Sequence, residues 1–115
     1  MDNKCKIAIK ALDEKKGINI KCLRVADLTV ITEYFVIAEG TSSTHVKALA
    51  DEVEYQMNIG CYAPRQIEGR SSGWILLDYH DVIVHVFSPD QRDYYNLEKL
   101  WADAIEEDIS SITGE

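Results

Sequence analysis

The chain lacks several features that would assign it to a function class directly. No apolar run approaches the roughly eighteen residues that a membrane helix needs. The charged start MDNKCKIAIKALDEKKG does not match the apolar core of a signal peptide. We therefore expect a cytoplasmic protein, or one of an equivalent interior compartment.

Cysteine is scarce, and its spacing is uninformative. Cys5, Cys22 and Cys61 form an odd set without a CxxC pair or a spacing typical of metal ligands. We expect reduced, partly buried thiols and no metal site.

Basic residues become rare after the first fifth of the chain. Seven of the twelve lysines and arginines precede Val25, whereas seventeen of the twenty carboxylates follow from there, and the whole chain carries −8. Such a surface repels phosphate backbones, so direct nucleic-acid binding is not expected. It would attract a basic protein partner, although simple solubility explains the charge equally well.

The hydrophobic periodicity predicts one domain over 1–105 and an acidic, flexible tail over 106–115 without a fixed structure. Helices are expected over 1–16, within 40–60 and over 95–107, the last with Asn96 as its cap. Strands are expected over 18–25, 33–40, 66–68, 74–79 and 82–87. The order α-β-β-α-β-β-β-α indicates an α/β fold with a mixed five-stranded sheet flanked by helices.

The loop GTSSTHV, from Gly40 to Val46, has the composition of a phosphate-binding loop at a helix start. A Walker motif requires a lysine, and this loop contains none. Helix capping explains its hydroxyl residues without a ligand. Phosphate binding is therefore the less favoured interpretation.

The hairpin GWILLDYHDVIVHVFSP carries residue types that suit either catalysis or docking. Strand alternation places Trp74 and Asp78 on one face, and gives His85 the apolar neighbours Ile83 and Phe87 on its own face. We expect His85 to be partly buried and hydrogen-bonded rather than a metal ligand. No serine elbow or cysteine signature indicates a nucleophile.

Aromatic and acidic residues gather in the last half of the chain, a mixture typical of a docking surface for a basic partner. Trp101 lies on a predicted helix stripe and is expected in the core. For Trp74 the sequence leaves both alternatives open, a core residue or an interface anchor.

Three segments, EYFVIAEGTSSTHVKALADEVE, IEGRSSGWILLDYHDVIVHVF and RDYYNLEKLWADA, together resemble the ribosomal silencing factor family, RsfS, also called Iojap. The resemblance runs from about Ile7 to Ala104. It departs from the common pattern at Glu33, where an aspartate usually precedes the Tyr-Phe pair.

The resemblance implies a domain related in fold to nucleotidyltransferases that has no catalytic activity and no cofactor. It implies binding to the basic large-subunit ribosomal protein fourteen, which blocks joining of the two subunits and represses translation under nutrient limitation. It also implies a set of partner-binding candidates: Glu68, Gly69, Trp74, Leu77, Asp78, Tyr79, Tyr95, Leu97 and Glu98.

Two other function classes stay open at this point. The first is a divergent nucleotidyltransferase that uses the GTSSTHV loop, but such enzymes need two metal-binding carboxylates one residue apart on a strand. Asp78 and Asp81 are three apart across a predicted turn, and this pairing is missing. The second is an oligomerising module, since a homodimer through a sheet edge is compatible with the sequence.

Overall fold

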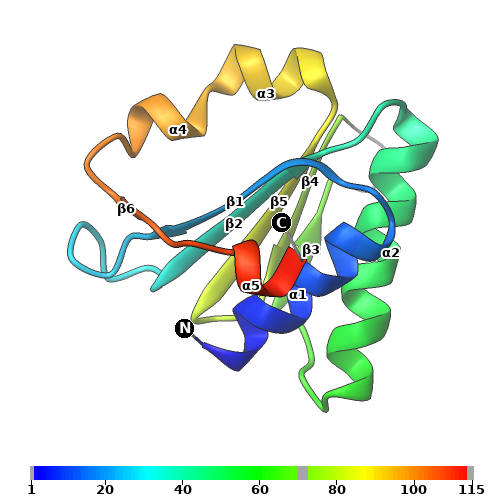
Figure 1. The fold of residues 1–115 in the computed structure, drawn as a ribbon, viewed down its shortest axis with the longest axis horizontal. Coiled ribbons are helices and arrows are strands. Elements are labelled where there is room, and N and C mark those ends of the chain that lie inside the picture. The colour runs from blue at the N-terminus through cyan, green and yellow to red at the C-terminus, as the bar shows by residue number, and fades with distance from the viewer. Residues whose placement is uncertain (1, 70–72, 114–115) are drawn as a thin grey trace.

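A computed structural model describes residues 2–69 and 73–113, apart from the side chains of residues 94 and 95. Helices and strands follow each other as expected over most of the chain (Figure 1). The elements are α1 (Asn3–Glu14), β1 (Ile18–Arg24), β2 (Tyr34–Glu39), α2 (Ser43–Ile59), β3 (Gln66–Glu68), β4 (Trp74–Asp78), β5 (Val82–Phe87), α3 (Pro89–Tyr95), α4 (Leu97–Leu100), β6 (Ile105–Glu106) and α5 (Ser110–Thr113).

The strands form one mixed sheet in the order β3-β4-β5-β2-β1-β6. Only the central pair β2 and β5 is parallel among the described strands, and the other pairs are antiparallel. The mixed α/β sheet is therefore confirmed, with six strands where five were expected. The additional strand is the two-residue β6, in which Ile105 pairs with Arg24 of β1.

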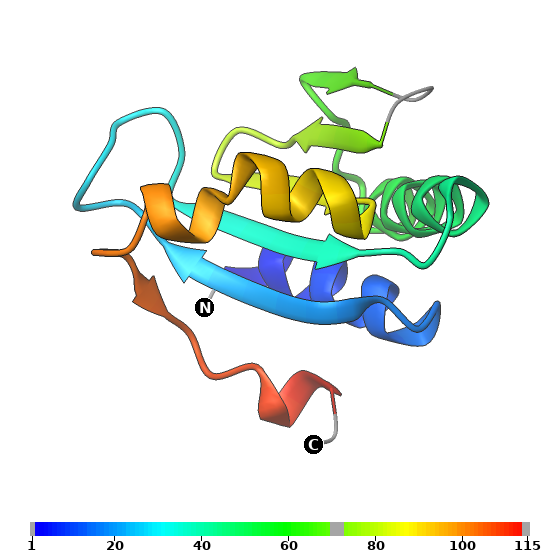
Figure 2. The same ribbon diagram turned by 90° about the horizontal axis from the view of Figure 1, so that it is seen from above.

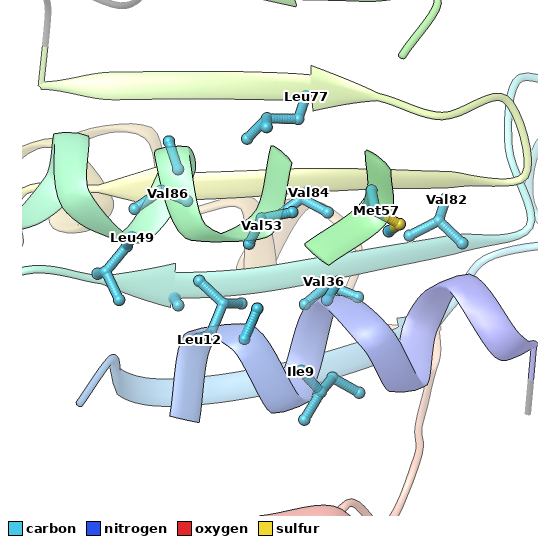
Figure 3. Close-up of a cluster of buried hydrophobic side chains, with 14 of the residues drawn as sticks. Ile9, Leu12, Val36, Leu49, Val53, Met57, Leu77, Val82, Val84 and Val86 are labelled. Atoms are coloured by element: carbon cyan, nitrogen blue, oxygen red, sulfur yellow. The ribbon is translucent and has the colours of Figure 1, made fainter. Parts of the chain in front are cut away.

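The first face of the sheet is covered by α1 and α2, and the main core lies between these layers (Figure 3). Each helix lies within its predicted range and begins after a capping side chain: Asp2 accepts a hydrogen bond from the Lys4 amide, and Ser42 accepts one from the His45 amide. The apolar stripes then face the sheet. The largest labelled side chains of this core are Ile9, Leu12, Val36, Leu49, Val53, Met57, Leu77, Val82, Val84 and Val86.

The second face is covered in part by α3 and α4, which lie across β5, β2 and β1 (Figure 2). The expectation of one helix over 95–107 is wrong. Pro89 begins a helix instead of only ending the strand, since proline is well suited to a first helical turn. Asn96 has φ 45°, ends α3 and caps α4, which stops at Leu100. Ile105 then pairs with the edge of β1, so strand pairing overrides the helical periodicity there.

The C-terminal segment also differs from the expectation of a tail without fixed structure. Residues 105–106 form β6, and Ile109 and Ile112 pack against the main core beside α1. The apolar side chains of Ile109 and Ile112 explain the difference, because they cover part of the core. The acidic composition of the segment gave no indication of this packing. None of the helices in the described ranges is both long and apolar enough to cross a membrane.

Candidate functional site

The candidate site lies on the second face of β3 and β4, beyond the part that α3 and α4 cover (Figure 2). Trp74, Leu76 and Asp78 alternate onto this face, and the register places Glu68 opposite Leu76. Trp74 and Leu76 are half-buried against the second core, so one side of each remains exposed. An aromatic and an aliphatic side chain thus present a partly open apolar surface.

Contacts with two described residues help to hold Trp74 in place. Its indole stacks on Phe87 with ring centroids 5.0 Å apart, and its Nε1–H donates a hydrogen bond to Nδ1 of His85 at 3.1 Å. The ring is therefore fixed in orientation although it is half-exposed. A rigid aromatic group of this kind is well suited to act as an interface anchor.

His85 is buried beneath Trp74, with the ring of Phe35 edge-on at 4.9 Å. The prediction of a buried, hydrogen-bonded histidine is confirmed. Burial lowers the pKa of His85 to about 3, so the imidazole is neutral at physiological pH. Because Nδ1 accepts the indole hydrogen, the ring proton lies on Nε2, which makes no hydrogen bond with any described residue.

Asp78 is buried and already has partners within the chain. Its carboxylate accepts hydrogen bonds from Nη2 of Arg65 at 2.7 Å and from the His80 amide at 2.9 Å. The Arg65 amide also donates to the Asp78 carbonyl. Asp78 therefore fixes the turn after β4, and the arginine that pairs with its carboxylate belongs to the chain itself.

Leu77 and Tyr79 lie on the opposite face from Trp74. Both are fully buried in the main core beneath α1 and α2. Their assignment as partner contacts is corrected, because the alternation that exposes Trp74 and Leu76 buries the residues between and after them. They support β4 and the turn that follows it from inside.

Glu68 ends β3 at the edge of the sheet, and Gly69 follows it. The Glu68 carboxylate accepts a hydrogen bond from the Gln66 side chain, and Glu68 is exposed. Gly69 has φ 80°, a left-handed conformation that glycine adopts without strain. Both residues border the candidate site.

Glu98 lies away from Glu68, above β2 and β1. Arg92 is buried and donates to Glu98 at 2.9 Å and to Glu39 at 3.2 Å, and Lys21 approaches Glu98 at 3.1 Å. The Arg92 hydrogen bond, with that of Lys21, holds the pKa of Glu98 below its usual value. These contacts fasten α3 and α4 to the sheet.

Leu97 packs against the same second core as Trp74. Tyr95 ends α3, and its side chain lies outside the described residues. The structure therefore brings Trp74 and Leu97 onto one core and places Glu98 in a separate ionic network. The candidate set omitted Leu76, although strand alternation places it on the same face as Trp74, and it omitted Arg92, which no local signal identified.

Polar groups of the GTSSTHV loop form hydrogen bonds with one another. The Thr41 amide donates to Nδ1 of His45 at 2.9 Å, and the Ser42 hydroxyl accepts from the His45 amide at 3.1 Å. A side chain on Gly40 would approach the Val46 amide to 2.7 Å, so packing alone requires the glycine. Helix capping and close packing account for this loop.

Carboxylates that could hold a metal are found elsewhere. Among the described residues, oxygens of Asp2, Glu33 and Asp81 lie within 4.8 Å of one another. Glu33 and Asp81 are exposed, and Lys4 approaches Asp81 at 3.6 Å. Exposed acidic groups with a lysine neighbour are common at surfaces, and this arrangement by itself does not indicate a catalytic centre.

Comparison with known proteins gives a consistent result. Residues 1–115 match the family described as "RsfS: Ribosomal silencing factor during starvation". Ribosomal silencing factor RsfS of Bacillus subtilis is 41% identical over 100 residues, which is 86% of this chain and 85% of that protein. The chloroplastic protein Iojap of Zea mays is 35% identical over 101 residues, 83% of this chain and 42% of that longer protein.

Solved structures support the same grouping. A crystal structure of a Chromobacterium violaceum protein is similar with a TM-score of 0.86 and 38% identity, covering 89% of this chain and 88% of that one. A Bacillus halodurans crystal structure is similar with a TM-score of 0.80 and 34% identity, covering 90% and 94%.

Proposed function

Because the chain belongs to the RsfS family of ribosomal silencing factors, we propose that it binds the large ribosomal subunit and blocks its association with the small subunit. The proposed contact is the basic large-subunit ribosomal protein fourteen, and the proposed result is repression of translation when nutrients are limiting. The protein acts as a binding factor in the cytoplasm, without a cofactor.

The observation that carries this proposal is the fixed, half-exposed indole of Trp74. It stacks on Phe87, is oriented by His85, and lies next to Leu76 on the open part of the second face. An apolar anchor of this kind suits a protein surface, and the exposed Glu68 opposite Leu76 would favour a basic one. The chain's charge of −8 would favour approach to such a partner.

Binding to large subunits is the first test. Purified protein is sedimented with isolated bacterial large ribosomal subunits at low and moderate salt, and subunit joining is then measured on sucrose gradients. Co-sedimentation together with a smaller fraction of joined ribosomes is the expected result. Absence of binding at low salt, where charge attraction is strongest, would contradict the proposal.

Variants then locate the contact. Trp74→Ala should weaken binding by more than about 1 kcal/mol, the level that defines an important interface residue. Tyr55→Ala is the control, because Tyr55 is exposed on α2 and α2 covers the other face of the sheet. Thermal unfolding of both variants separates loss of contact from loss of folding. Normal affinity of a folded Trp74→Ala variant would remove Trp74 from the interface.

A further inference from the structure

The connection between β1 and β2, residues 25–33, exposes several large apolar side chains to solvent. Leu28 is 45% exposed, Ile31 is 66% exposed, and Val30 is fully exposed. Single exposed apolar residues are normal, but three within four positions of one loop form a patch. Such patches frequently mark interaction sites.

This loop is held in a defined conformation. The Val25 amide donates to the Glu33 carbonyl at 2.8 Å and closes the loop, while the amides of Leu28 and Thr29 both donate to the Val25 carbonyl. Val25 and Thr32 are buried at its two ends. The exposed side chains therefore extend from a backbone that hydrogen bonds hold in place. Less conformational entropy of the loop is then lost on binding.

A groove separates this loop from the turn between β4 and β5. The two segments are joined at its base, where the amides of Glu33 and Tyr34 both donate to the Asp81 carbonyl at 3.0 Å. Figure 2 shows the loop projecting past the strand ends next to that turn. The groove has a volume of about 450 Å³, and its lining includes Val30, Ile31, Glu33, Arg65, His80 and Asp81.

The groove combines an apolar wall with negative charge. Val30 and Ile31 form the apolar side, while the carboxylates of Glu33 and Asp81 lie with that of Asp2 within a 4.8 Å cluster. Two cations offset part of this charge. The Lys4 ammonium group is 3.6 Å from Asp81 and also donates to the Tyr79 carbonyl, and Arg65 lines the groove while it pairs with Asp78. An arginine or lysine with an apolar neighbour would satisfy both sides of the groove.

We propose that this groove is a second docking site, which takes a basic and apolar segment of the ribosomal partner. The identity of the partner rests on the proposed function, whereas the chemistry of the segment rests on the groove. A basic segment is favoured over an acidic one as the occupant, because the carboxylates of Glu33 and Asp81 line the groove.

Through Arg65, the groove is linked to the sheet face that carries Trp74. Arg65 lines the groove and is hydrogen-bonded to Asp78, which lies on the same face of β4 as Trp74 and Leu76. The five residues of β4 span about 17 Å, at roughly 3.4 Å per residue. One protein partner can therefore contact Trp74 at one end of β4 and the groove at the other.

A matched pair of variants tests the apolar wall. Ile31→Ser changes a side chain that is 66% exposed in the loop, and Ile59→Ser makes the same change at 60% exposure at the end of α2. Both leave the net charge unaltered, and neither removes a buried side chain. Ile31→Ser should weaken binding to large ribosomal subunits about tenfold, whereas Ile59→Ser should bind like the unmodified protein.

A second pair tests the charge. Glu33→Gln removes a carboxylate at the groove, and Glu14→Gln removes an exposed one on α1. Glu33→Gln should weaken binding several-fold at low salt and less at high salt, because screening already reduces the attraction there. Glu14→Gln should change binding much less.

The outcomes separate the two proposals. If the unmodified protein does not bind large subunits, the proposed function fails, and the groove loses its partner with it. If the unmodified protein binds but Ile31→Ser and Glu33→Gln bind equally well, the groove proposal is overturned and the proposed function stands. Equal losses in Ile31→Ser and Ile59→Ser would also overturn it, since the effect would then not be specific to the groove.

Discussion

Acid should destabilise this protein through His85, and the size of the effect follows from its burial. The pKa of His85 is lowered to about 3 in the folded chain by desolvation, whereas an unfolded histidine titrates near about 6.5. Between these values the unfolded state binds the additional proton. Stability is therefore complete above about pH 6.5 and is lost as the pH falls towards 3.

The expected magnitude at a moderate pH is substantial. Each pH unit below 6.5 costs about 1.4 kcal/mol, so the free energy of unfolding should be about 2 kcal/mol smaller at pH 5 than at pH 7.5. At pH 5 most ordinary carboxylates are still ionised. The ion pairs of Arg92 with Glu39 and Glu98 should therefore persist there.

Urea unfolding at the two pH values, followed by circular dichroism, measures this difference. In His85→Phe the ring packing between Phe35 and Phe87 is approximately kept and the titrating group is removed, so most of the difference should disappear. His80→Asn is the control, because His80 is exposed in a turn at φ 71°, a conformation that asparagine tolerates. An unmodified protein with the same stability at both pH values would refute the desolvation argument, as would an undiminished difference in His85→Phe.

Three further predictions concern packing, the ionic network and the helix-start loop. Leu77→Ala should lower the free energy of unfolding by about 2–5 kcal/mol, as measured by urea unfolding, because Leu77 is fully buried. Leu76→Ala should lower it by much less in the same measurement, because Leu76 is half-buried on the other face. Arg92→Gln should lower the free energy of unfolding by about 2 kcal/mol, because Glu39 and Glu98 lose their buried hydrogen-bond donor. Arg24→Gln is the control at an exposed position and should change the free energy of unfolding by less than about 0.5 kcal/mol. Titration calorimetry with ATP and magnesium should detect no binding, because Thr41 and Ser42 already bond to His45; measurable binding would reopen the enzyme hypothesis.

The sequence by itself determined most of the secondary structure and the sorting of side chains between the two sheet faces. Local capping and apolar periodicity located α1 and α2, and period-two alternation placed Trp74 and Ile75 on opposite faces of the sheet. The same alternation predicted a buried environment for His85. These features are local, so neighbouring residues are sufficient to specify them.

The sequence located the candidate site only in part. It singled out Trp74, but it also selected Leu77 and Tyr79, because a shared motif does not say which of its residues face inward. Asp78 and Glu98 are the right residue types for a basic partner. Their arginines, however, come from Arg65 and Arg92 of the same chain, and such pairings become visible only when distant segments meet.

Only the tertiary structure decided the course of residues 101–113 and the shape of the groove. The segment after Leu100 has helical periodicity, yet its backbone pairs with the open edge of β1, and Ile109 and Ile112 cover the core beside α1. The groove beside Val30 exists because the Asp81 carbonyl draws two distant segments together. Both features depend on contacts between residues far apart in the chain, which local propensity does not encode.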